Sequence, residues 1–191
     1  MDTGKYLRRK EGIAVAESAL TKKIKLALYK HTKAHLQGVY GAFEVVMGQN
    51  TMGYGNEHVD FLTMNSDNEF RCYEIKVSKE DLHSNAQLSF YGDFNYVVIP
   101  DENLVPGLLQ EAIHFVSAVY GSKTGILVYH EAAFNGRPYF TMPWKPKRQK
   151  IRIEQRIANM HNMVRSISRY VTKDLCKKED TPQDIIFTLK E

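Results

Sequence analysis

The sequence predicts an α/β fold, a sandwich in which a mixed β-sheet packs against helices. Short segments rich in β-branched and aromatic residues recur along the chain, and two of them are wholly apolar, as buried central strands are. Longer segments with apolar residues three and four positions apart alternate with them. The resulting order is helix, three antiparallel strands, short helix, strand, helix, strand, helix.

The first half of the chain supplies the opening helix and a group of three strands. Residues 12–36 have helical apolar spacing with lysines in between. Strands are expected at 42–47, 58–64 and 70–77. The turn formers Asn65-Ser66-Asp67-Asn68 join the last two into an antiparallel hairpin.

The second half alternates between helix and strand. Residues 79–91 are polar and predict a short helix or an ordered loop. Apolar strands are expected at 96–99 and 125–130, with a helix over 105–120 between them. The pattern ends with a helix from about 149 to 174.

The last helix carries a regular apolar stripe, so we expect this helix to pack on another surface while its arginines face elsewhere, and the extension to pack on the core. The chain leaves the core through Pro143 and Pro146. We therefore divide it into a domain at 1–142 and a basic helical extension at 143–191. The stripe consists of Ile153, Ile157, Met160, Val164, Ile167 and Val171.

Composition indicates one globular domain of the cytoplasm. Of 191 residues, 43% are hydrophobic and 25% charged, as is ordinary for such proteins. No apolar run approaches the ~18 residues of a membrane span, and none follows the basic N-terminus as a secretory signal would. The two cysteines, Cys72 and Cys176, are too few and too far apart for a disulfide framework or a zinc site.

The charge is unevenly distributed. Residues 145–173 hold nine basic residues against Glu154 alone, a net charge of +8. Since the whole chain has a net charge of +4, the remainder carries −4. An acidic body beside a basic segment fits a metal site next to a phosphate-binding surface. A solvated basic helix face explains the same charges.

Asp60, Glu74 and Lys76 interrupt the apolar hairpin. Asp60 lies in the middle of one strand, and Glu74 and Lys76 lie two apart on the next, so their side chains share a face. Charged residues are rarely buried in apolar strands unless they are paired or bound to a metal. The alternative is a solvent-exposed face with a Glu–Lys cross-strand pair.

The hairpin brings Asp60 close to Glu74, and two adjacent carboxylates favour a hard cation between them. Mg²⁺ (or Mn²⁺) is bound by one or two carboxylates with water and phosphate oxygens, and the carbonyl of Ile75 is a further candidate ligand. Such an ion activates water and neutralises charge on a phosphate. Lys76 is placed to position the water or to stabilise that charge.

These residues resemble the core motif of the PD-(D/E)XK nuclease superfamily. The motif is Val59-Asp60, thirteen residues, then Glu74-Ile75-Lys76-Val77-Ser78, with Val59 in place of the usual proline. The continuation through Asp81 and the segment Phe90 to Pro100 are similar to the MmcB-like DNA-repair branch. The resemblance covers about residues 12–130.

The resemblance implies a restriction-endonuclease-like α/β/α core and a Mg²⁺-dependent endonuclease acting in DNA repair, recombination or phage DNA processing. It also implies one more glutamate from the first helix, for which Glu17 is the matching position and Glu44 a rival. Gln87 and Lys79 match positions that assist the site in some members.

The basic segment supplies candidate DNA contacts. Two sets of residues repeat every four positions and are expected to track phosphates without reading bases. They are Arg148, Arg152 and Arg156, then Arg165, Arg169 and Lys173.

Two other functions stay open. One is a non-catalytic nucleic-acid-binding protein that uses the basic helix. The other is a protein-interaction module whose last helix docks a partner or a second copy, giving a homodimer. The form of the DNA, its sequence preference and the kind of cut are left undetermined.

Overall fold

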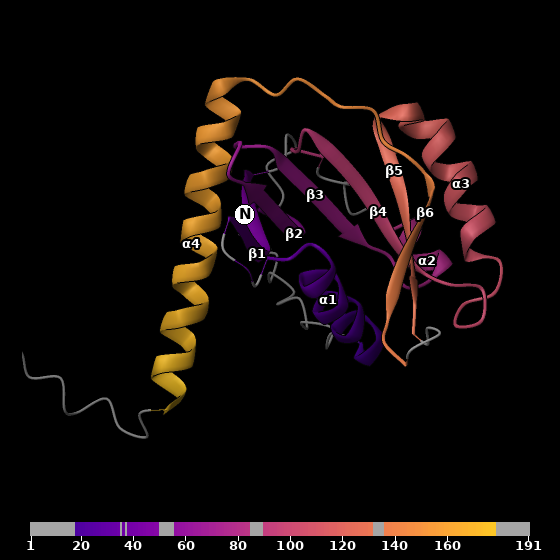
Figure 1. The fold of residues 1–191 in the computed structure, drawn as a ribbon, viewed down its shortest axis with the longest axis horizontal. Helices are drawn as coiled ribbons and strands as arrows, with labels where there is room; N and C mark the ends of the chain where they lie inside the picture. Colours follow the sequence, from indigo (N-terminus) through magenta and orange to yellow (C-terminus); the bar gives the residue numbers. More distant parts are fainter. Residues whose placement is uncertain are drawn as a thin grey trace, which may run out of the picture.

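The structure is a computed structural model that describes residues 18–34, 36, 38–49, 56–84, 90–131 and 136–178. Within these ranges the chain forms a mixed sheet with helices on both faces (Figure 1). The elements are α1 (Ala19–His31), β1 (Val39–Gln49), β2 (Asn56–Asn65), β3 (Phe70–Ile75), α2 (Lys79–Leu82), β4 (Phe94–Pro100), α3 (Leu108–Val119), the 3-10 turn η1 (Gly121–Lys123), β5 (Thr124–His130), β6 (Tyr139–Trp144) and α4 (Ile153–Lys178).

The six strands lie in the sheet in chain order, from β1 to β6. The pairs β1–β2 and β2–β3 are antiparallel, whereas β3–β4 and β4–β5 are parallel. β6 returns antiparallel to β5 at the edge. The predicted α/β class with a mixed sheet is therefore confirmed.

The helices enclose three apolar cores. On one face, α1 packs Ile24 and Leu28 against β2 to β5. On the other face, α2 and α3 cover β4 and β5, and α4 packs Met163 against β1, β2 and β3. The face shared by α3 and α4 thus has two separate cores.

Among the described residues, no helix is long and apolar enough to cross a bilayer.

β6 is the strand that the sequence pattern missed. It contains Pro143, and most of its residues are exposed. Both features belong to an edge strand, where a missing N–H and a solvated face are tolerated. The domain boundary expected between 142 and 143 falls inside this strand.

The last helix packs on the sheet through Met163, but its apolar stripe does not make this contact. The apolar stripe faces solvent, and the side chains buried against the sheet are Asn159, Met163 and Ser166. Polar side chains can face the body here because they find partners. The Asn159 amide donates to the Tyr91 carbonyl at 2.9 Å, and the Ser166 hydroxyl donates to the Glu44 carbonyl at 3.3 Å. Periodicity located the stripe, but it carried no information on which helix face the sheet would meet.

A buried ion pair fixes the start of α4. Arg156 donates to both carboxylate oxygens of Asp93, at 2.6 and 3.1 Å, and Asp93 also accepts the Phe70 N–H at 2.9 Å. The side chain of Asp93 is 1% exposed and that of Arg156 is 24% exposed. This bidentate pair joins the helix to the start of β3.

Candidate functional site

Asp60 and Glu74 lie where β2 separates from β3. The last registered pair of these strands is Phe61 with Tyr73, and each acidic residue is the next one beyond it. Past this point the Ile75 N–H donates to the Asp60 carboxylate at 2.7 Å. Beyond the last backbone pair, the Asp60 side chain therefore accepts a hydrogen bond from the backbone of β3.

Glu74 and Lys76 are buried, at 5% and 6% exposure. In the register, Glu74 is beside Val97, whose side chain belongs to the core under α3. Two residues earlier, Cys72 belongs to the core under α4. Glu74 therefore lies on the face covered by α3 and α4, between their two cores, where burial makes a charge costly.

The pKa of the Cys72 thiol is affected by both carboxylates. Burial raises the pKa of Cys72 well above its ordinary value, and the nearby charges of Glu74 and Asp60 raise it further. Both carboxylates therefore act electrostatically on the same part of the sheet.

Asp81 holds Lys76 in place. Lys76 Nζ lies 3.4 Å from Asp81 Oδ1, and the Val77 N–H donates to the other oxygen at 3.1 Å. The Ser78 hydroxyl accepts the Asp81 N–H as the N-cap of α2. Sequence reasoning gave Asp81 no role, although the spacing Ser78-x-x-Asp81 is a capping signal that points to it.

The carboxyl of Asp60 resists ionisation. Burial raises the pKa of Asp60 to about 6, and the Glu44 charge also raises it. The Ile75 hydrogen bond and the charges of Lys25 and Lys76 oppose that rise. Lys25, on α1, was not predicted as a site residue, because nothing in the helix pattern distinguishes it from the neighbouring lysines.

Glu44 extends the acidic row to β1. The registered pairs Phe43 with Phe61 and Val45 with Val59 place it opposite Asp60. Glu44 has φ of +48°, a strained value for a residue with a side chain. On either side of it, Phe43 packs with the α1 core and Val45 with the α4 core. The backbone at Glu44 therefore reverses the alternation of β1 beside Asp60.

The row of Glu44, Asp60 and Glu74 does not converge on one point. Among the described residues, no three His, Cys, Asp or Glu side chains are grouped so as to hold one ion. Glu44 forms a short ion pair with Lys25 instead. Asp60 and Glu74 offer carboxylate oxygens, the kind of ligand that Mg²⁺ takes together with water and phosphate oxygens. The Ile75 carbonyl stays a predicted ligand.

Glu17 and Gln87 lie outside the described residues, so whether Glu17 completes the site stays open. Lys79, the other residue weighed as an assistant, is exposed on α2.

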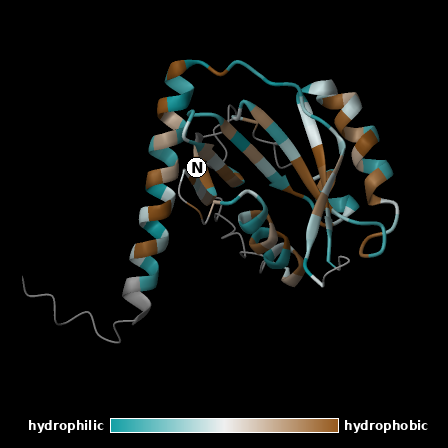
Figure 2. Ribbon diagram, viewed as in Figure 1, coloured by the Kyte–Doolittle hydropathy of each residue, from teal (hydrophilic) through white to brown (hydrophobic). Residues whose placement is uncertain are grey.

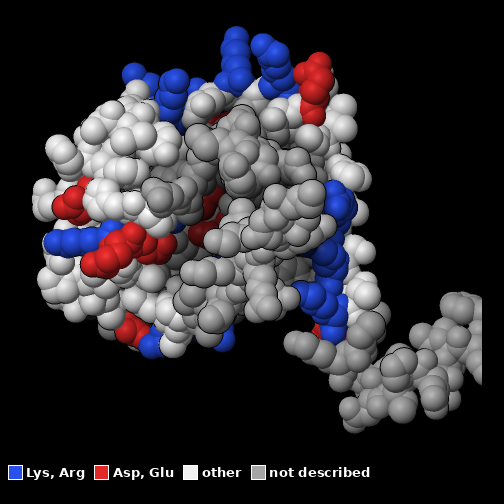
Figure 3. All heavy atoms as spheres, turned by 180° about the vertical axis from the view of Figure 1, so that it is seen from behind, with Lys and Arg blue, Asp and Glu red and all other residues white. Residues whose placement is uncertain are grey.

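The basic side of α4 borders this region. A cavity of 220 Å³ is lined by Glu44, His58, Arg169, Tyr170 and Lys173. The Arg169 guanidinium donates to the Glu44 carbonyl at 3.4 Å. Figure 3 shows acidic atoms deep in the middle of this face and basic atoms along α4 at its edge.

The predicted arginine repeats are only partly as expected. α4 begins at Ile153, so Arg148 and Arg152 precede it and do not share a helical stripe with Arg156. Arg156 forms an ion pair with Asp93, so its guanidinium is not available to contact a phosphate. Arg165 is exposed, as a phosphate contact must be.

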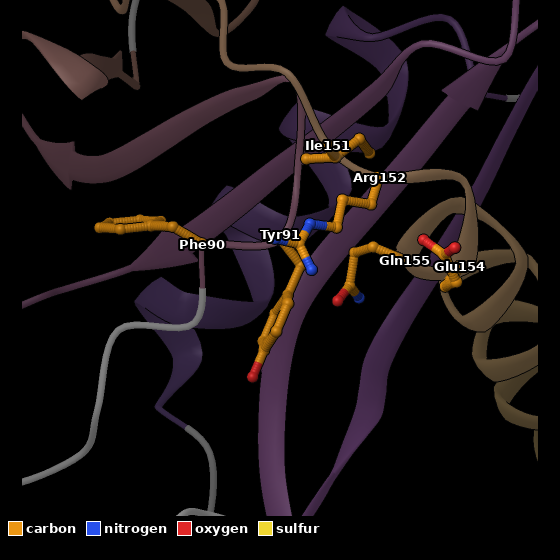
Figure 4. Close-up of a pocket in the computed structure, with 6 residues that line it drawn as sticks. All are labelled: Phe90, Tyr91, Ile151, Arg152, Glu154 and Gln155. Carbon is orange, nitrogen blue, oxygen red and sulfur yellow. The ribbon is translucent and has the colours of Figure 1, made fainter.

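Arg152 lines a second cavity, at the start of α4. This cavity measures 380 Å³, and its walls come from segment 90–91, the chain before α4 and the first turn of the helix (Figure 4). It combines the aromatic rings of Phe90 and Tyr91 with a guanidinium, the residue types on which single-stranded bases stack.

The comparisons with known proteins give a likeness of fold. No protein-family model and no curated protein matches this chain. Its structure is similar to that of a protein of unknown function from Silicibacter pomeroyi. The TM-score is 0.58 and the identity 13%, over 89% of this chain and 100% of that one. At this identity the likeness concerns the fold alone.

Proposed function

We propose that this protein is a metal-dependent endonuclease that hydrolyses phosphodiester bonds in DNA, with a restriction-endonuclease-like core. The observation that carries the proposal is the position of Asp60, Glu74 and Lys76 where β2 and β3 separate. Glu74 and Lys76 are buried there, and the pKa of Asp60 is raised. Buried charged side chains beside a carboxyl whose pKa is raised are typical of functional sites.

Each residue of the site has a chemical role in this proposal. Asp60 and Glu74 supply hard oxygen ligands, and the bound Mg²⁺ (or Mn²⁺) activates water and offsets charge on the phosphate. The Ile75 N–H orients Asp60. Lys76 stabilises negative charge on the phosphate, and Asp81 positions its ammonium group.

The substrate proposal rests on the basic side of α4. Arg165, Arg169 and Lys173 carry positive charge along the helix that borders the acidic row. A polyanion bound there would pass the site. We include a role in DNA repair, recombination or phage DNA processing because of the resemblance in the motif.

The test is cleavage of a labelled panel (plasmid, single strand, fork and four-way junction) with Mg²⁺, Mn²⁺ or EDTA. We expect metal-dependent cutting that falls on the order of 100-fold or more in Asp60→Asn, Glu74→Gln and Lys76→Ala. Glu80→Gln is the matched control, because Glu80 is an exposed glutamate of α2 and should leave the rate unchanged.

A second function, non-catalytic DNA binding, is favoured by the ion pair of Glu44 with Lys25, which occupies a carboxylate that a three-carboxylate metal site would use. DNA affinity that is unaffected by EDTA, with no cutting of any substrate by the wild type, would replace the nuclease proposal with this one.

A further inference from the structure

The outer side of α4 is an apolar surface on an otherwise polar helix. Figure 2 shows hydrophobic residues recurring along its length. Six of them are exposed: Ile153 by 63%, Ile157 by 61%, Met160 by 43%, Val164 by 65%, Ile167 by 42% and Val171 by 53%. We call this set the α4 stripe. Continuous apolar surface of this kind marks an interaction site.

The spacing of the α4 stripe matches one kind of partner, another helix with the same repeat. Its members follow one another at intervals of four and three residues in strict alternation, which is the repeat of a coiled-coil seam. The β-branched residues Ile157, Val164 and Val171 occupy one of the two seam positions throughout. A lipid surface or an irregular groove does not require this alternation.

The α4 stripe is also symmetric about residue 162. When two copies of the helix run antiparallel, Ile153 meets Val171, Ile157 meets Ile167, and Met160 meets Val164. Every member then has a partner in the other copy, as a two-fold interface demands.

The two orientations place the basic segment before the helix differently. Five basic residues, from Lys145 to Arg152, precede the helix. Parallel pairing would bring the two basic segments side by side. Antiparallel pairing separates them by about 27 Å, the rise of some 18 helical residues.

The area is also sufficient. At these exposures the α4 stripe presents on the order of 600 Å² per copy, and the adjacent Tyr170 is 49% exposed. A stable interface buries about 800 Å² per partner. Two stripes with their flanking residues reach that range.

We propose that the protein forms a two-fold homodimer through the α4 stripe, as a short antiparallel coiled coil. The proposal is independent of the endonuclease proposal, because none of the stripe residues belongs to the site or to the basic side of α4.

The first test is the mass of the full chain in solution from roughly 1 to 100 μM, by light scattering or sedimentation. The wild type should rise from 22.0 kDa toward twice that value. Val164→Lys should raise the dissociation constant on the order of 100-fold, because it places a charge in the seam. Val164 is 65% exposed, so the monomer should fold normally by circular dichroism.

Thr172→Lys is the matched control. It introduces the same charge at an exposed β-branched residue next to, but outside, the α4 stripe, and its dissociation constant should stay within a few-fold of the wild type. A wild type that stays monomeric throughout the range overturns the dimer, even if it binds vesicles or another protein. Equal dissociation of both lysine variants overturns the stripe as the interface.

Cysteine cross-linking tests the orientation in a Cys176→Ser background. A mixture of Ile153→Cys and Val171→Cys chains should form a disulfide between the two variants under mild oxidation. Each variant alone should remain reduced. Rapid self-cross-linking of either variant alone would show a parallel pair and overturn the antiparallel register.

Discussion

Asp60 is the residue on which the site depends. Its carboxyl is held by the Ile75 N–H and lies within the influence of Lys25, Lys76 and Glu44. Burial outweighs these partners, so the pKa of Asp60 rises from 3.8 to about 6. A metal ion would supply the missing positive charge and favour the ionised form.

Asp60→Asn should stabilise the protein in neutral solution. The folded protein binds this proton more tightly than the unfolded chain does, so the wild type loses stability as the pH rises from about 4 through about 6. The loss corresponds to roughly 3 kcal/mol at most, at about 1.4 kcal/mol for each tenfold change in proton affinity. Asparagine keeps an oxygen for the Ile75 N–H and avoids the charge.

Urea unfolding at pH 4, 6 and 8 measures this effect. The variant should exceed the wild type at pH 8 and match it near pH 4, while Asp67→Asn, at an exposed turn residue, should match it throughout. Lower stability of Asp60→Asn at pH 8 would mean that the ionised carboxylate is stabilised by its neighbours.

At the scale of the element, α4 is held by polar contacts and not by its apolar repeat. Arg156 reaches Asp93, Asn159 reaches the Tyr91 carbonyl, and Ser166 reaches the Glu44 carbonyl. Met163 is the apolar residue of the helix that is buried in the core. Hydrogen bonds therefore determine which side of α4 faces the sheet and leave the apolar repeat for another partner.

Arg156→Ala should destabilise the protein by about 3 kcal/mol, because it leaves the carboxylate of Asp93 buried, with the Phe70 N–H as the hydrogen-bond donor that remains to it among the described residues. Arg165→Ala, at an exposed arginine of the same helix, should change the free energy of unfolding by less than about 0.5 kcal/mol. Urea unfolding of both variants gives the comparison. Equal small losses would show that the ion pair contributes no more than a surface charge.

At the scale of the whole molecule, the fold places the acidic residues and the basic residues of the chain side by side. The acidic row lies across β1, β2 and β3, and α4 carries Arg165, Arg169 and Lys173 along its border. A polyanion attracted to the helix is thereby brought next to buried carboxylates, which repel it unless a cation intervenes. Under the proposed function, metal and nucleic acid bind together for this reason.

Replacing Arg165, Arg169 and Lys173 with Gln should weaken DNA binding and make it less sensitive to salt. Each lost phosphate contact should reduce the slope of log affinity against log salt by about 0.9. Fluorescence anisotropy across a salt series measures the slope. The control replaces Lys22, Lys30 and Lys33, exposed lysines on or just after α1. If the control lowers the slope as much, the binding surface lies elsewhere.

The sequence by itself determined the α/β class, the order of most elements, and the two strands that carry Asp60, Glu74 and Lys76. These follow from local periodicity, because alternation distinguishes a strand and three- and four-residue spacing distinguishes a helix. It missed β6, since an exposed edge strand with a proline lacks that alternation.

Only the tertiary structure decided how distant segments meet. It brought Lys25 to Glu44, Asp81 to Lys76 and Arg156 to Asp93, and it turned the α4 stripe toward solvent. Two of these ion pairs join residues 19 and 63 positions apart, and the pair of Asp81 with Lys76 forms where β3 leads into α2. A periodic pattern shows that a helix has an apolar side, whereas the hydrogen bonds and ion pairs of the folded chain select the side that faces the sheet.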